Sequence, residues 1–341
     1  MIIGIHKSNW GFTPDWIKYC QENSLNYKLV DCYSPNIYEQ LKDCDALLWH
    51  YSQSGAKEVL FAKQLFYSLT YAGLKVFPDF NSNWHFDDKV GQKYLLEAIH
   101  AATPKTWVFY EKREAFRWAE TFSFPAVFKL RGGAGSNNVR LVKSKFEAKK
   151  LIHKAFGKGF PSYNKTVDLK ENFRLFEWDK KHITELLKSI RRLFYSTRYA
   201  KTIGPQKGYI LFQEYIPGNA FDIRIITIGH RAFGIKRLVR DNDFRASGSG
   251  RILYRKEEID QRCVKIAFET TAKMKALCVA YDFVFTPQNN PLIVEINYGF
   301  AHQAYFPCPG YWDNNLIWHE EKFNAAHWIV EEIIKSLNNE H

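Results

Sequence analysis

The sequence predicts an N-terminal α/β domain with a parallel sheet, followed by two α+β units, and three observations lead to this fold class. Over the first 80 residues, apolar runs of strand length alternate with segments whose apolar residues recur at helical spacing. Repeated strand–helix units of this kind are typical of a parallel sheet covered by helices. From residue 124 onward, pairs of apolar runs flank short turns containing Gly, Pro or Asn, which favours antiparallel hairpins. With 341 residues, 46% of them hydrophobic, the chain is long enough for two or three domains.

The N-terminal region is expected to contain four strands joined by three helices. The strands are expected at residues 1–6, 27–33, 45–51 and 74–80, and the helices at residues 13–24, 36–43 and 56–73. Thr13 is the expected N-cap of the first helix, with Pro14 at the first helical position, where its missing N–H costs no hydrogen bond. Gly73 is expected to end the third helix.

The stretch "FPAVFKLRGGAGSNNVRLV", residues 124–142, combines a lysine in an apolar run with a cluster of glycines. It is not a Walker loop, because no Gly-Lys-Ser/Thr follows, and it is not a dinucleotide fingerprint, because Asn138 stands where a third glycine belongs. Val127, Lys129 and Arg131 alternate with apolar residues, so the flanks are expected to be strands and the glycines the tip of a hairpin. A lysine in such a strand needs an anion, and glycines let backbone N–H groups approach phosphate.

Further elements are expected on both sides of this hairpin. Helices are expected at residues 88–101, 112–122, 180–196, 257–278 and 320–337, and strands at residues 105–110 and 208–218. Two more hairpins are expected, one over residues 222–239 that turns at Gly229-His230 and one over residues 280–297 that turns between Pro287 and Asn290. Residues 241–251 are expected to form a loop.

Charge and composition limit the setting of the protein. The net charge is +12, and residues 145–208 hold 16 Lys and Arg against 6 Asp and Glu, so most of the excess lies in one segment. Such a segment can bind nucleic acid, but a solvated, mostly helical insertion is the favoured interpretation. The longest apolar runs are far shorter than the ~20 residues of a transmembrane helix, the N-terminus lacks a secretory leader, and no C-x-x-C pair occurs among six cysteines. We therefore expect a cytoplasmic protein without a membrane partner.

Oxygen-bearing side chains near the C-terminal hairpin predict a metal site. Glu295 and Asn297 are two residues apart on one strand, so they share a face, and Asp282 lies on the partner strand. Three oxygen ligands on a rigid hairpin suit Mg²⁺, which takes its remaining ligands from water and substrate phosphates. Polar residues on a solvent-facing edge hairpin remain the alternative interpretation.

Two further groups precede the hairpin. Gln213, Glu214, Tyr215 and Ile216 end a strand at a turn, where alternating backbone N–H and C=O groups can serve an adenine ring; a plain buried strand end is the alternative. Guanidinium and ammonium groups that can bind phosphoryl oxygens or a carboxylate follow at Arg224, Lys236, Arg245 and Arg251, unless they are surface charges.

In this order and combination, the segments resemble the ATP-grasp superfamily, most closely carboxylate–amine ligases such as ribosomal-protein glutamate ligases, glutathione synthetases and D-alanine–D-alanine ligases. The resemblance runs from about Asp88 to Gly299 and is interrupted by the basic insertion. It implies a pre-ATP-grasp domain at residues 1–87, an ATP-grasp subdomain at 88–215 that carries the insertion at 145–208, and a C-terminal ATP-grasp subdomain at 216–341. ATP is expected to bind between the two subdomains.

The resemblance also implies a role for each candidate residue. Lys129 matches the second ATP-binding lysine, and the first is Lys105 or, as the less favoured choice, Lys89. The flexible glycine loop that closes over the phosphates is matched by Gly132, Gly133, Gly135 and Ser136, and the adenine hinge by Gln213, Glu214, Tyr215 and Ile216. Catalytic contacts to the phosphoryl group and the substrate fall to Arg224, Lys236, Arg245 and Arg251, and metal ligation to Asp282, Glu295 and Asn297.

The implied activity is ATP- and Mg²⁺-dependent joining of a carboxylate to an amine through an acyl phosphate, with two Mg²⁺ ions and with Mn²⁺ able to replace them. The substrates are expected to be small molecules or peptides, and a homodimer is left open. Residues 298–302, Tyr-Gly-Phe-Ala-His, depart from the family's usual Ser/Pro-Gly turn, so substrate identity does not carry over. An ATP-grasp kinase acting on a hydroxyl, or a nucleotide- or nucleic-acid-binding protein without ligase activity, are the alternatives.

Overall fold

The computed structural model describes residues 1–53, 55–132, 139–162, 184, 187–191, 197–239, 245–246 and 250–339. The N-terminal unit is a parallel sheet, as predicted, and its strand order is β2-β1-β3-β4. Its strands are β1 (Ile3–His6), β2 (Tyr27–Val30), β3 (Ala46–Leu48) and β4 (Lys75–Phe77), and its helices are α1 (Thr13–Glu22), α2 (Ile37–Leu41), α3 (Glu58–Tyr71) and α4 (Phe80–Asn83). Each strand is largely apolar, because helices cover the sheet.

The start of α1 and the end of α3 can be compared with the helix ends expected from the sequence. Pro14 lies in the first turn of α1 as predicted, but Thr13 is not its cap, because Phe12 precedes the helix and the Thr13 hydroxyl donates to the His6 carbonyl at 3.5 Å. Gly73 follows α3 with φ of +88°, a left-handed conformation that glycine adopts without strain.

The second unit is an antiparallel sheet with the order β5-β8-β6-β7. It consists of β5 (Thr106–Phe109), β6 (Ala126–Lys129), β7 (Val139–Val142) and β8 (Ile210–Glu214), and α6 (Lys112–Thr121) and α7 (Lys145–Ala155) pack together against it. The pairing of β6 with β7 confirms the hairpin predicted from the glycine-rich stretch. The helix expected at 180–196 lies mostly outside the described residues.

The third unit is a seven-stranded sheet with the path β13-β12-β9-β10-β14-β15, and β11 pairs with β10. Its strands are β9 (Phe221–Ile228), β10 (Arg231–Leu238), β11 (Ile252–Leu253), β12 (Cys278–Phe285), β13 (Pro291–Asn297), β14 (Tyr311–Asp313) and β15 (Trp318–His319). Both predicted hairpins are present, and β14 and β15 were not expected. One face, with Ile223 and Ile225, packs on α11 (Gln261–Met274), while Ile226 and Ile228 on the other face join the core of the N-terminal unit.

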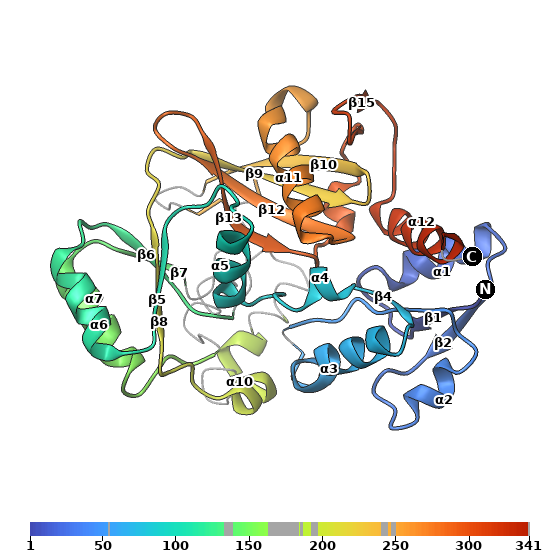
Figure 1. The fold of residues 1–341 in the computed structure, drawn as a ribbon, viewed down its shortest axis with the longest axis horizontal. Helices are drawn as coiled ribbons and strands as arrows, with labels where there is room; N and C mark the ends of the chain where they lie inside the picture. The colour runs from blue at the N-terminus through green and yellow to red at the C-terminus, as the bar shows by residue number, and fades with distance from the viewer. Residues whose placement is uncertain are drawn as a thin grey trace.

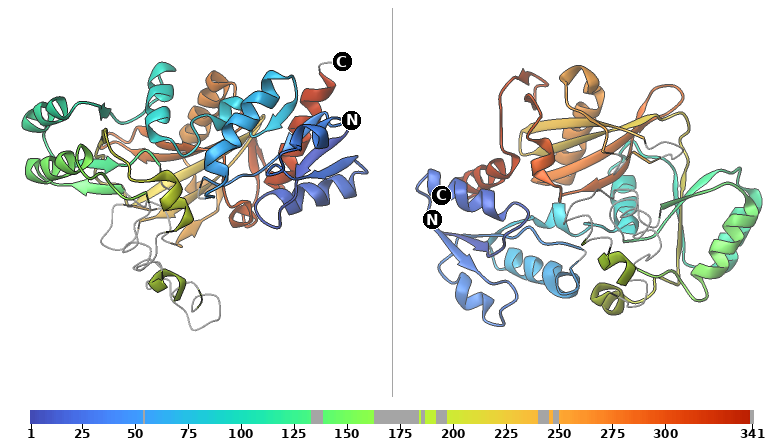
Figure 2. Two further views of the ribbon diagram at one scale, coloured as in Figure 1. Left: turned by 90° about the horizontal axis from the view of Figure 1, so that it is seen from below. Right: turned by 180° about the vertical axis from the view of Figure 1, so that it is seen from behind.

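The three units meet around α5 (Lys89–Ala98) in the middle of the molecule (Figure 1). The β5–β8 sheet and the N-terminal unit lie at opposite ends, with the large sheet between them, as Figure 2 also shows. The C-terminal helix α12 (Ala325–Asn338) returns to pack beside α1, so the two termini lie close together. It begins at Ala325 rather than near Glu320, because the Asn324 side chain caps it by accepting from the Ala326 N–H at 3.0 Å.

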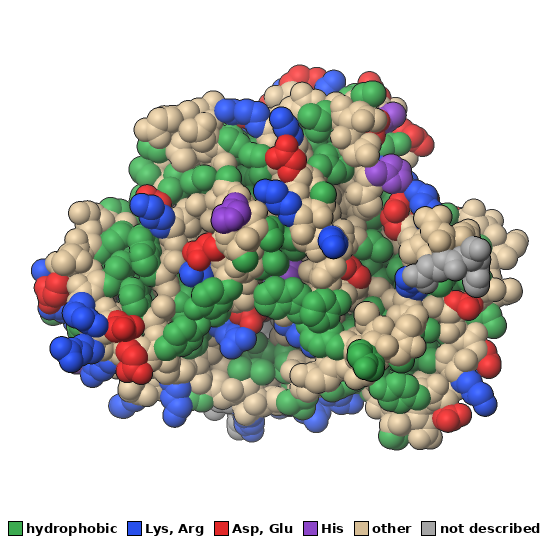
Figure 3. Space-filling view, in the orientation of Figure 1, with side chains coloured by type: hydrophobic (Ala, Val, Ile, Leu, Met, Phe, Trp, Pro, Cys, Tyr) green, Lys and Arg blue, Asp and Glu red, His purple; other side chains and the backbone are tan. Residues whose placement is uncertain are grey.

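The described part of the basic segment includes α7 and α10 (Arg198–Ile203). In Figure 3, Lys and Arg side chains gather along the left rim, where α6 and α7 lie in Figure 1. Lys145 donates to the Glu120 carboxylate at 2.8 Å, and Lys149 pairs with the same carboxylate. This partial neutralisation by α6 fits a solvated helical surface. No helix among the described residues is long and apolar enough to cross a membrane.

Candidate functional site

The main candidate site is a cleft between the β5–β8 sheet and the large sheet, enclosing about 920 Å³ including its solvent-open part. Strands β6 and β8 and the β8–β9 connection form one side, and β12 and β13 form the other. Both charged and apolar residues line the cleft. The charged ones are Lys89, Lys129, Glu214, Asp222, Arg245, Asp282 and Glu295, and the apolar ones are Val127, Val139, Ile216, Phe221, Val239, Ala246, Val284 and Val294. We call this cleft the first cavity.

Lys129 crosses the first cavity from one sheet to the other. It is the last residue of β6 and only 8% exposed, and its Nζ donates to the Val294 carbonyl on β13 at 3.1 Å. Burial lowers the pKa of Lys129 to about 8, although the Glu295 carboxylate opposes this shift. A buried ammonium held by one carbonyl suits an anionic ligand.

Lys89 enters the same space from the first position of α5. Its Nζ is 3.2 Å from Glu295 Oε1 and 3.8 Å from Asp87 Oδ1. Burial alone would lower the pKa of Lys89, but the carboxylates of Glu295 and Asp87 outweigh it and raise that pKa. The sequence favoured Lys105 as the first lysine, yet Lys105 is exposed and is not among the described residues that line either this cavity or its neighbours.

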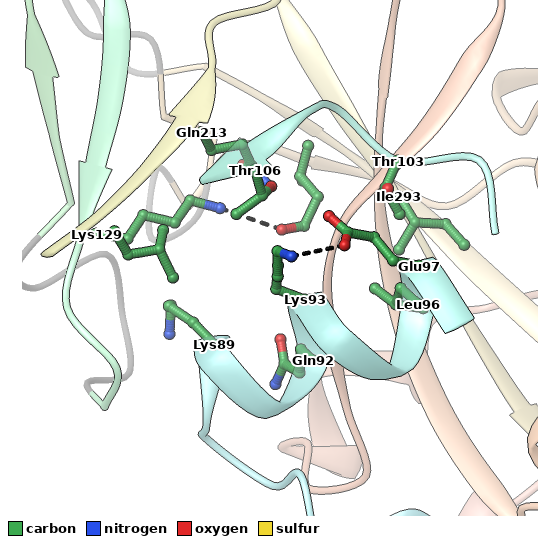
Figure 4. Close-up of a pocket in the computed structure, with 12 residues that line it drawn as sticks. Lys89, Gln92, Lys93, Leu96, Glu97, Thr103, Thr106, Lys129, Gln213 and Ile293 are labelled. Carbon is green, nitrogen blue, oxygen red and sulfur yellow. Dashed lines mark hydrogen bonds and ion pairs between the residues drawn. The ribbon is translucent and has the colours of Figure 1, made fainter. Parts of the chain in front are cut away.

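A narrower recess of about 400 Å³ adjoins the first cavity beside α5 (Figure 4). Lys89, Lys129 and Gln213 line both spaces. Figure 4 shows Lys93 and Glu97 of α5 paired across its wall, with 2.6 Å between Lys93 Nζ and Glu97 Oε2. Lys89 and Lys129 therefore extend into the space between α5 and the strands β6 and β13, and not into open solvent.

Asp282 and Glu295 face each other across the β12–β13 hairpin, as the sequence predicted, because they are direct partners in the strand register. Asp282 Oδ1 lies 2.7 Å from Arg224 Nε and 3.0 Å from an Arg237 Nη. Burial would raise the pKa of Asp282, but the two guanidinium groups outweigh it and hold that pKa below its usual value. Asp282 is thus an ionised carboxylate fixed by two arginines.

Arg237 is a site residue that the sequence did not identify. It forms two parallel hydrogen bonds with Asp222, both at 2.7 Å, and reaches Asp282 as well. Lys236, which was expected here, lies on the opposite face of β10, where its Nζ is 3.0 Å from Glu258 and 4.2 Å from the centre of the Phe221 ring. The pairing register of the β9–β10 hairpin could have identified Arg237, because it makes Arg237 the direct partner of Asp222 on β9.

The expected adenine hinge ends β8 at the rim of the first cavity. Gln213, Glu214, Tyr215 and Ile216 all line it. The Glu214 N–H donates to the Lys105 carbonyl at 2.8 Å, and Glu214 Oε2 accepts from the Lys105 N–H at 3.3 Å. Asn219, which the sequence analysis missed, ties this segment to β12: its amide donates to the carbonyls of Ile216 and Phe285 and accepts from the Phe285 N–H at 2.7 Å.

The base of the expected glycine loop is tied to the start of α5. Asp88 Oδ1 caps α5 by accepting from the N–H groups of Val90 and Gly91 at 3.1 and 2.9 Å, while Asp88 Oδ2 accepts from Arg131 Nε at 2.9 Å. The Gly132 N–H donates to Gln206 Oε1 at 3.5 Å. Gly133, Gly135 and Ser136 lie outside the described residues. The loop therefore starts from an anchored strand end.

Of the three predicted metal ligands, the structure brings only the two carboxylates together. Asp282 and Glu295 bring two carboxylates to one end of the first cavity. Asn297 lies farther along β13, and its Oδ1 accepts from the Gly299 N–H at 2.9 Å. In the part of the chain that the structure describes, no three His, Cys, Asp or Glu side chains form a group suited to a metal. Of the remaining predicted residues, Arg245 lines the cavity, whereas Arg251 is exposed and lines none of the cavities described here.

A second cavity of about 810 Å³ lies between the N-terminal unit and the end of β13. It is lined by Trp10, Gly11, His50, Tyr51, Ser52, Gln53, Phe86, Asp87, Asn297, Gly299, Phe300, Ala301, His302 and Gln303. Lys89 of the first cavity is 3.8 Å from Asp87 of the second, so the two cavities adjoin at this ion pair.

Comparison with known proteins identifies the fold. Residues 195–303 match the family model described as the RimK-like ATP-grasp domain. Among solved structures, the D-cycloserine synthetase DcsG matches with a TM-score of 0.59 and 12% identity, over 99% of this chain and 100% of that chain. A RimK domain ATP-grasp protein from Sphaerobacter thermophilus matches with a TM-score of 0.58 and 14% identity, over 97% of this chain and 98% of that chain.

A third solved structure, the D-alanine–D-alanine ligase from Bacillus anthracis in complex with ATP, matches with a TM-score of 0.56 and 14% identity, over 100% of this chain and 99% of that chain. No curated protein sequence matches this chain significantly. At these identities the likeness to solved structures extends to the fold, which is that of ATP-grasp ligases over the whole chain.

Proposed function

We propose that this ATP-grasp protein is an ATP- and Mg²⁺-dependent ligase that joins a carboxylate to an amine through an acyl phosphate. One observation carries the proposal: a single cavity between two sheets collects two buried lysines, two carboxylates and a strand-end hinge. Lys89 and Lys129 supply positive charge, and Asp282 and Glu295 supply oxygen ligands. A nucleoside triphosphate needs positive charge and metal-binding oxygens around its phosphates, and an apolar slot for its base.

The apolar part of the first cavity suits an adenine ring. Val127, Ile216 and Val284 lie on its walls, and the Glu214–Ile216 segment offers backbone groups at the rim. From there a triphosphate would extend toward Lys129 and Lys89. Phosphate oxygens would offset the cost of burying the Lys129 ammonium, which has one carbonyl as its hydrogen-bond partner in this structure. Lys89, rather than Lys105, is our choice for the first ATP-binding lysine.

Asp282 and Glu295 are the residues that we propose to hold Mg²⁺. Their carboxylate oxygens are the ligand type that Mg²⁺ prefers, and Arg224 and Arg237 fix Asp282 in its ionised form. When bound, the ion would supply neutralisation of phosphate charge. Asn297 would have to give up its hydrogen bond from Gly299 to join them. The donor set fits one ion held by two carboxylates, and a second ion, or Mn²⁺ in its place, would depend on phosphate oxygens.

The reaction requires positive charge where the carboxylate meets the terminal phosphate. A carboxylate oxygen would attack the γ-phosphorus and release ADP, and the amine would then attack the acyl carbon and release phosphate. Arg245 lines the cavity, and Arg224 lies beside Asp282, which supports the proposal that both neutralise oxygens in these steps. We propose that the glycine loop, including Gly132, Gly133, Gly135 and Ser136, covers the phosphates and excludes water.

The test is ADP release with pooled carboxylic acids and pooled amines, supplied separately and together with MgATP. A ligase requires both pools for sustained release, and the product mass equals acid plus amine minus water. Release with one hydroxyl acceptor and a phosphorylated product would indicate a kinase instead. Normal nucleotide binding without release in any pool would indicate a binding protein. A steep loss of nucleic-acid affinity with added salt would support the basic-segment alternative.

A further inference from the structure

We infer that the second cavity binds the amine co-substrate in its ammonium form, and that this amine carries a flat, uncharged ring and no carboxylate. The inference rests on the proposed ligase function and adds a substrate class to it. It depends on three features of the second cavity: its junction with the first cavity, the charge of its lining, and its aromatic wall.

The junction places the second cavity next to the proposed phosphate end. Along β13, Glu295 lines the first cavity and Asn297, two residues later, lines the second. Lys89 connects the two, since its Nζ is 3.2 Å from Glu295 and 3.8 Å from Asp87. A molecule in the second cavity with its ammonium group at Asp87 would therefore face the acyl phosphate. Transfer of one proton from the ammonium group to the Asp87 carboxylate would free the nitrogen lone pair to attack the acyl carbon and release phosphate.

The charge of the lining favours a cation over a carboxylate. Among the described residues that line the second cavity there is no Lys or Arg, and Asp87 is the one carboxylate. The Lys89 ammonium group pairs with Asp87 at 3.8 Å but lies nearer to Glu295, at 3.2 Å. The Asp87 side chain is 10% exposed, and its φ of +50° lies in the left-handed region that residues other than glycine rarely adopt. Such backbone strain is typical of functional positions. Guanidinium groups lie instead on the side of the first cavity, which Arg245 lines and where Arg224 and Arg237 pair with the lining residue Asp282.

The two histidines do not change this charge. His50 Nδ1 accepts from the Phe12 N–H at 3.2 Å, so the neutral ring carries its hydrogen on Nε2. Burial, together with nearby His302, lowers the pKa of His50 to about 3, so the ring stays uncharged near neutral pH. His302 Nε2 lies 2.8 Å from Asp15 Oδ2, and any positive charge on His302 is balanced there.

The wall of the second cavity is aromatic. The Trp10 ring, 49% exposed, has its centre 5.1 Å from that of His50, which in turn stacks on Phe12 at 3.9 Å and 17°. Phe86 and Phe300 line the same space. An exposed indole on a cavity wall is a ready surface for a second ring and for an ammonium group.

The inference is tested by binding to the full chain saturated with Mg²⁺ and a non-hydrolysable ATP analogue. Three amines separate the features: tyramine has a ring and an ammonium group, tyrosine adds a carboxylate, and ethylamine lacks the ring. We expect tyramine to bind at least ~10-fold more tightly than either of the others, a difference of ~1.4 kcal/mol. Saturation-transfer NMR and calorimetry measure these affinities without needing the acid substrate.

Variants of this chain locate the binding. Trp10→Ala and Asp87→Asn should each weaken tyramine at least ~10-fold, and Trp10→Ala should leave the affinity for the ATP analogue unchanged. The matched controls, Tyr38→Ala at a 56% exposed aromatic residue and Asp43→Asn at an exposed carboxylate, should leave tyramine binding unchanged.

Opposite results overturn the inference in identifiable ways. Tyrosine binding as tightly as tyramine would contradict the charge argument, and ethylamine doing so would contradict the aromatic wall. Unchanged tyramine affinity in both variants would remove the site from the second cavity. If the ATP analogue binds normally but no amine does, this inference fails while the proposed nucleotide site stands, whereas loss of analogue binding defeats the proposed function itself.

Discussion

Single buried charged residues determine how the first cavity responds to pH and to substitution. Lys129 and Lys89 bring two ammonium groups to one end of it, and Glu295 is the carboxylate nearest to Lys89. Lys129 has a carbonyl rather than a carboxylate as its hydrogen-bond partner, which is why burial lowers its pKa to about 8 while the pKa of Lys89 is raised. The two lysines should therefore respond differently to pH and to substitution.

Lys129→Met is expected to stabilise the ligand-free protein at pH 7. Because the folded pKa of about 8 lies below the usual 10.5, protonation disfavours folding. This cost is absent above pH 10.5, grows as pH falls toward 8, and below 8 is complete at about 3 kcal/mol. The gain in unfolding temperature should therefore shrink between pH 8 and 10. Differential scanning fluorimetry over this range measures it, and a loss of stability in the variant at pH 7 would contradict the argument.

The same substitution should weaken nucleotide binding and remove part of its pH dependence. A triphosphate favours the ammonium form, so the wild-type dissociation constant should rise as pH increases past about 8. Lys129→Met should show weaker binding with a flatter profile. Lys105→Met, at an exposed lysine outside the cavity, is the control and should keep wild-type affinity. Calorimetry with MgATP measures both.

Glu295→Gln is expected to reduce ADP formation at least ~100-fold, because an amide cannot supply the charge that a metal and Lys89 require. The unfolding temperature should change by no more than about 3 °C, since the amide keeps the side-chain shape and Lys89 retains Asp87 as a partner. Glu269→Gln on the exposed side of α11 is the control. Near-normal turnover in Glu295→Gln would refute the proposed metal ligand.

At the level of secondary structure, helix α5 links Lys89 to the base of the glycine loop. Asp88 caps α5 with one carboxylate oxygen and holds Arg131, at the base of the loop, with the other. The Lys89 N–H donates to the Arg131 carbonyl at 2.9 Å. The start of the helix, the first lysine and the loop base therefore form one hydrogen-bonded unit.

Asp88→Ala is expected to lower the free energy of unfolding by about 1–2 kcal/mol and to weaken nucleotide binding. Loss of the cap destabilises α5, and loss of the Arg131 pair frees the loop base. Asp260→Ala removes a comparable cap, that of α11, and should cost a similar free energy without changing nucleotide affinity. Urea unfolding and calorimetry on both variants separate the effects; equal nucleotide affinities would contradict the proposed link.

The helices, strands and hairpins that could be predicted from the sequence are those that depend on local apolar periodicity and turn residues. The parallel N-terminal sheet and the three hairpins follow from apolar patterns and turn residues, as does the pairing of Asp282 with Glu295. Strands β14 and β15 were not predicted, because they are short and depend on contact with β10. Lys236 was expected at the site because residues 222–237 resemble a strand pair of the ATP-grasp family, but a shift of one residue along a strand moves a side chain to the other face. That shift brings Arg237 to the site.

Other site residues depend on contacts between distant segments. The sequence favoured Lys105 over Lys89, because the resemblance to the family is loose in this region and the sequence alone does not show which lysine lies near β13. In the folded chain the start of α5, with Lys89, lies against β13. Asn219 and Asp87 acquire their roles only when the units assemble, Asn219 by bonding to β12 and Asp87 by lying at the junction of two cavities. Neither position has a spacing that a sequence pattern could reveal.

On the scale of the whole molecule, the cavities lie where the units meet. The first lies between two sheets, and the second lies between the N-terminal unit and the end of β13. One core cluster joins the N-terminal sheet to Ile226, Phe233 and α12. The β5–β8 sheet has a separate core, packed on α6 and α7. A nucleotide in the first cavity would therefore bridge two bodies with separate cores.

MgATP is accordingly expected to raise the unfolding temperature of the whole chain. At 100 times the dissociation constant, binding adds about 2.7 kcal/mol, which for a protein of this size corresponds to roughly 5 °C. Chelation of Mg²⁺ should remove most of the shift, because the triphosphate would then face the unscreened carboxylates of Asp282 and Glu295. Glu295→Gln should show a smaller shift that depends less on Mg²⁺. Equal shifts with and without the chelator would mean that the triphosphate binds through the lysines alone, and the two carboxylates would lose their proposed role.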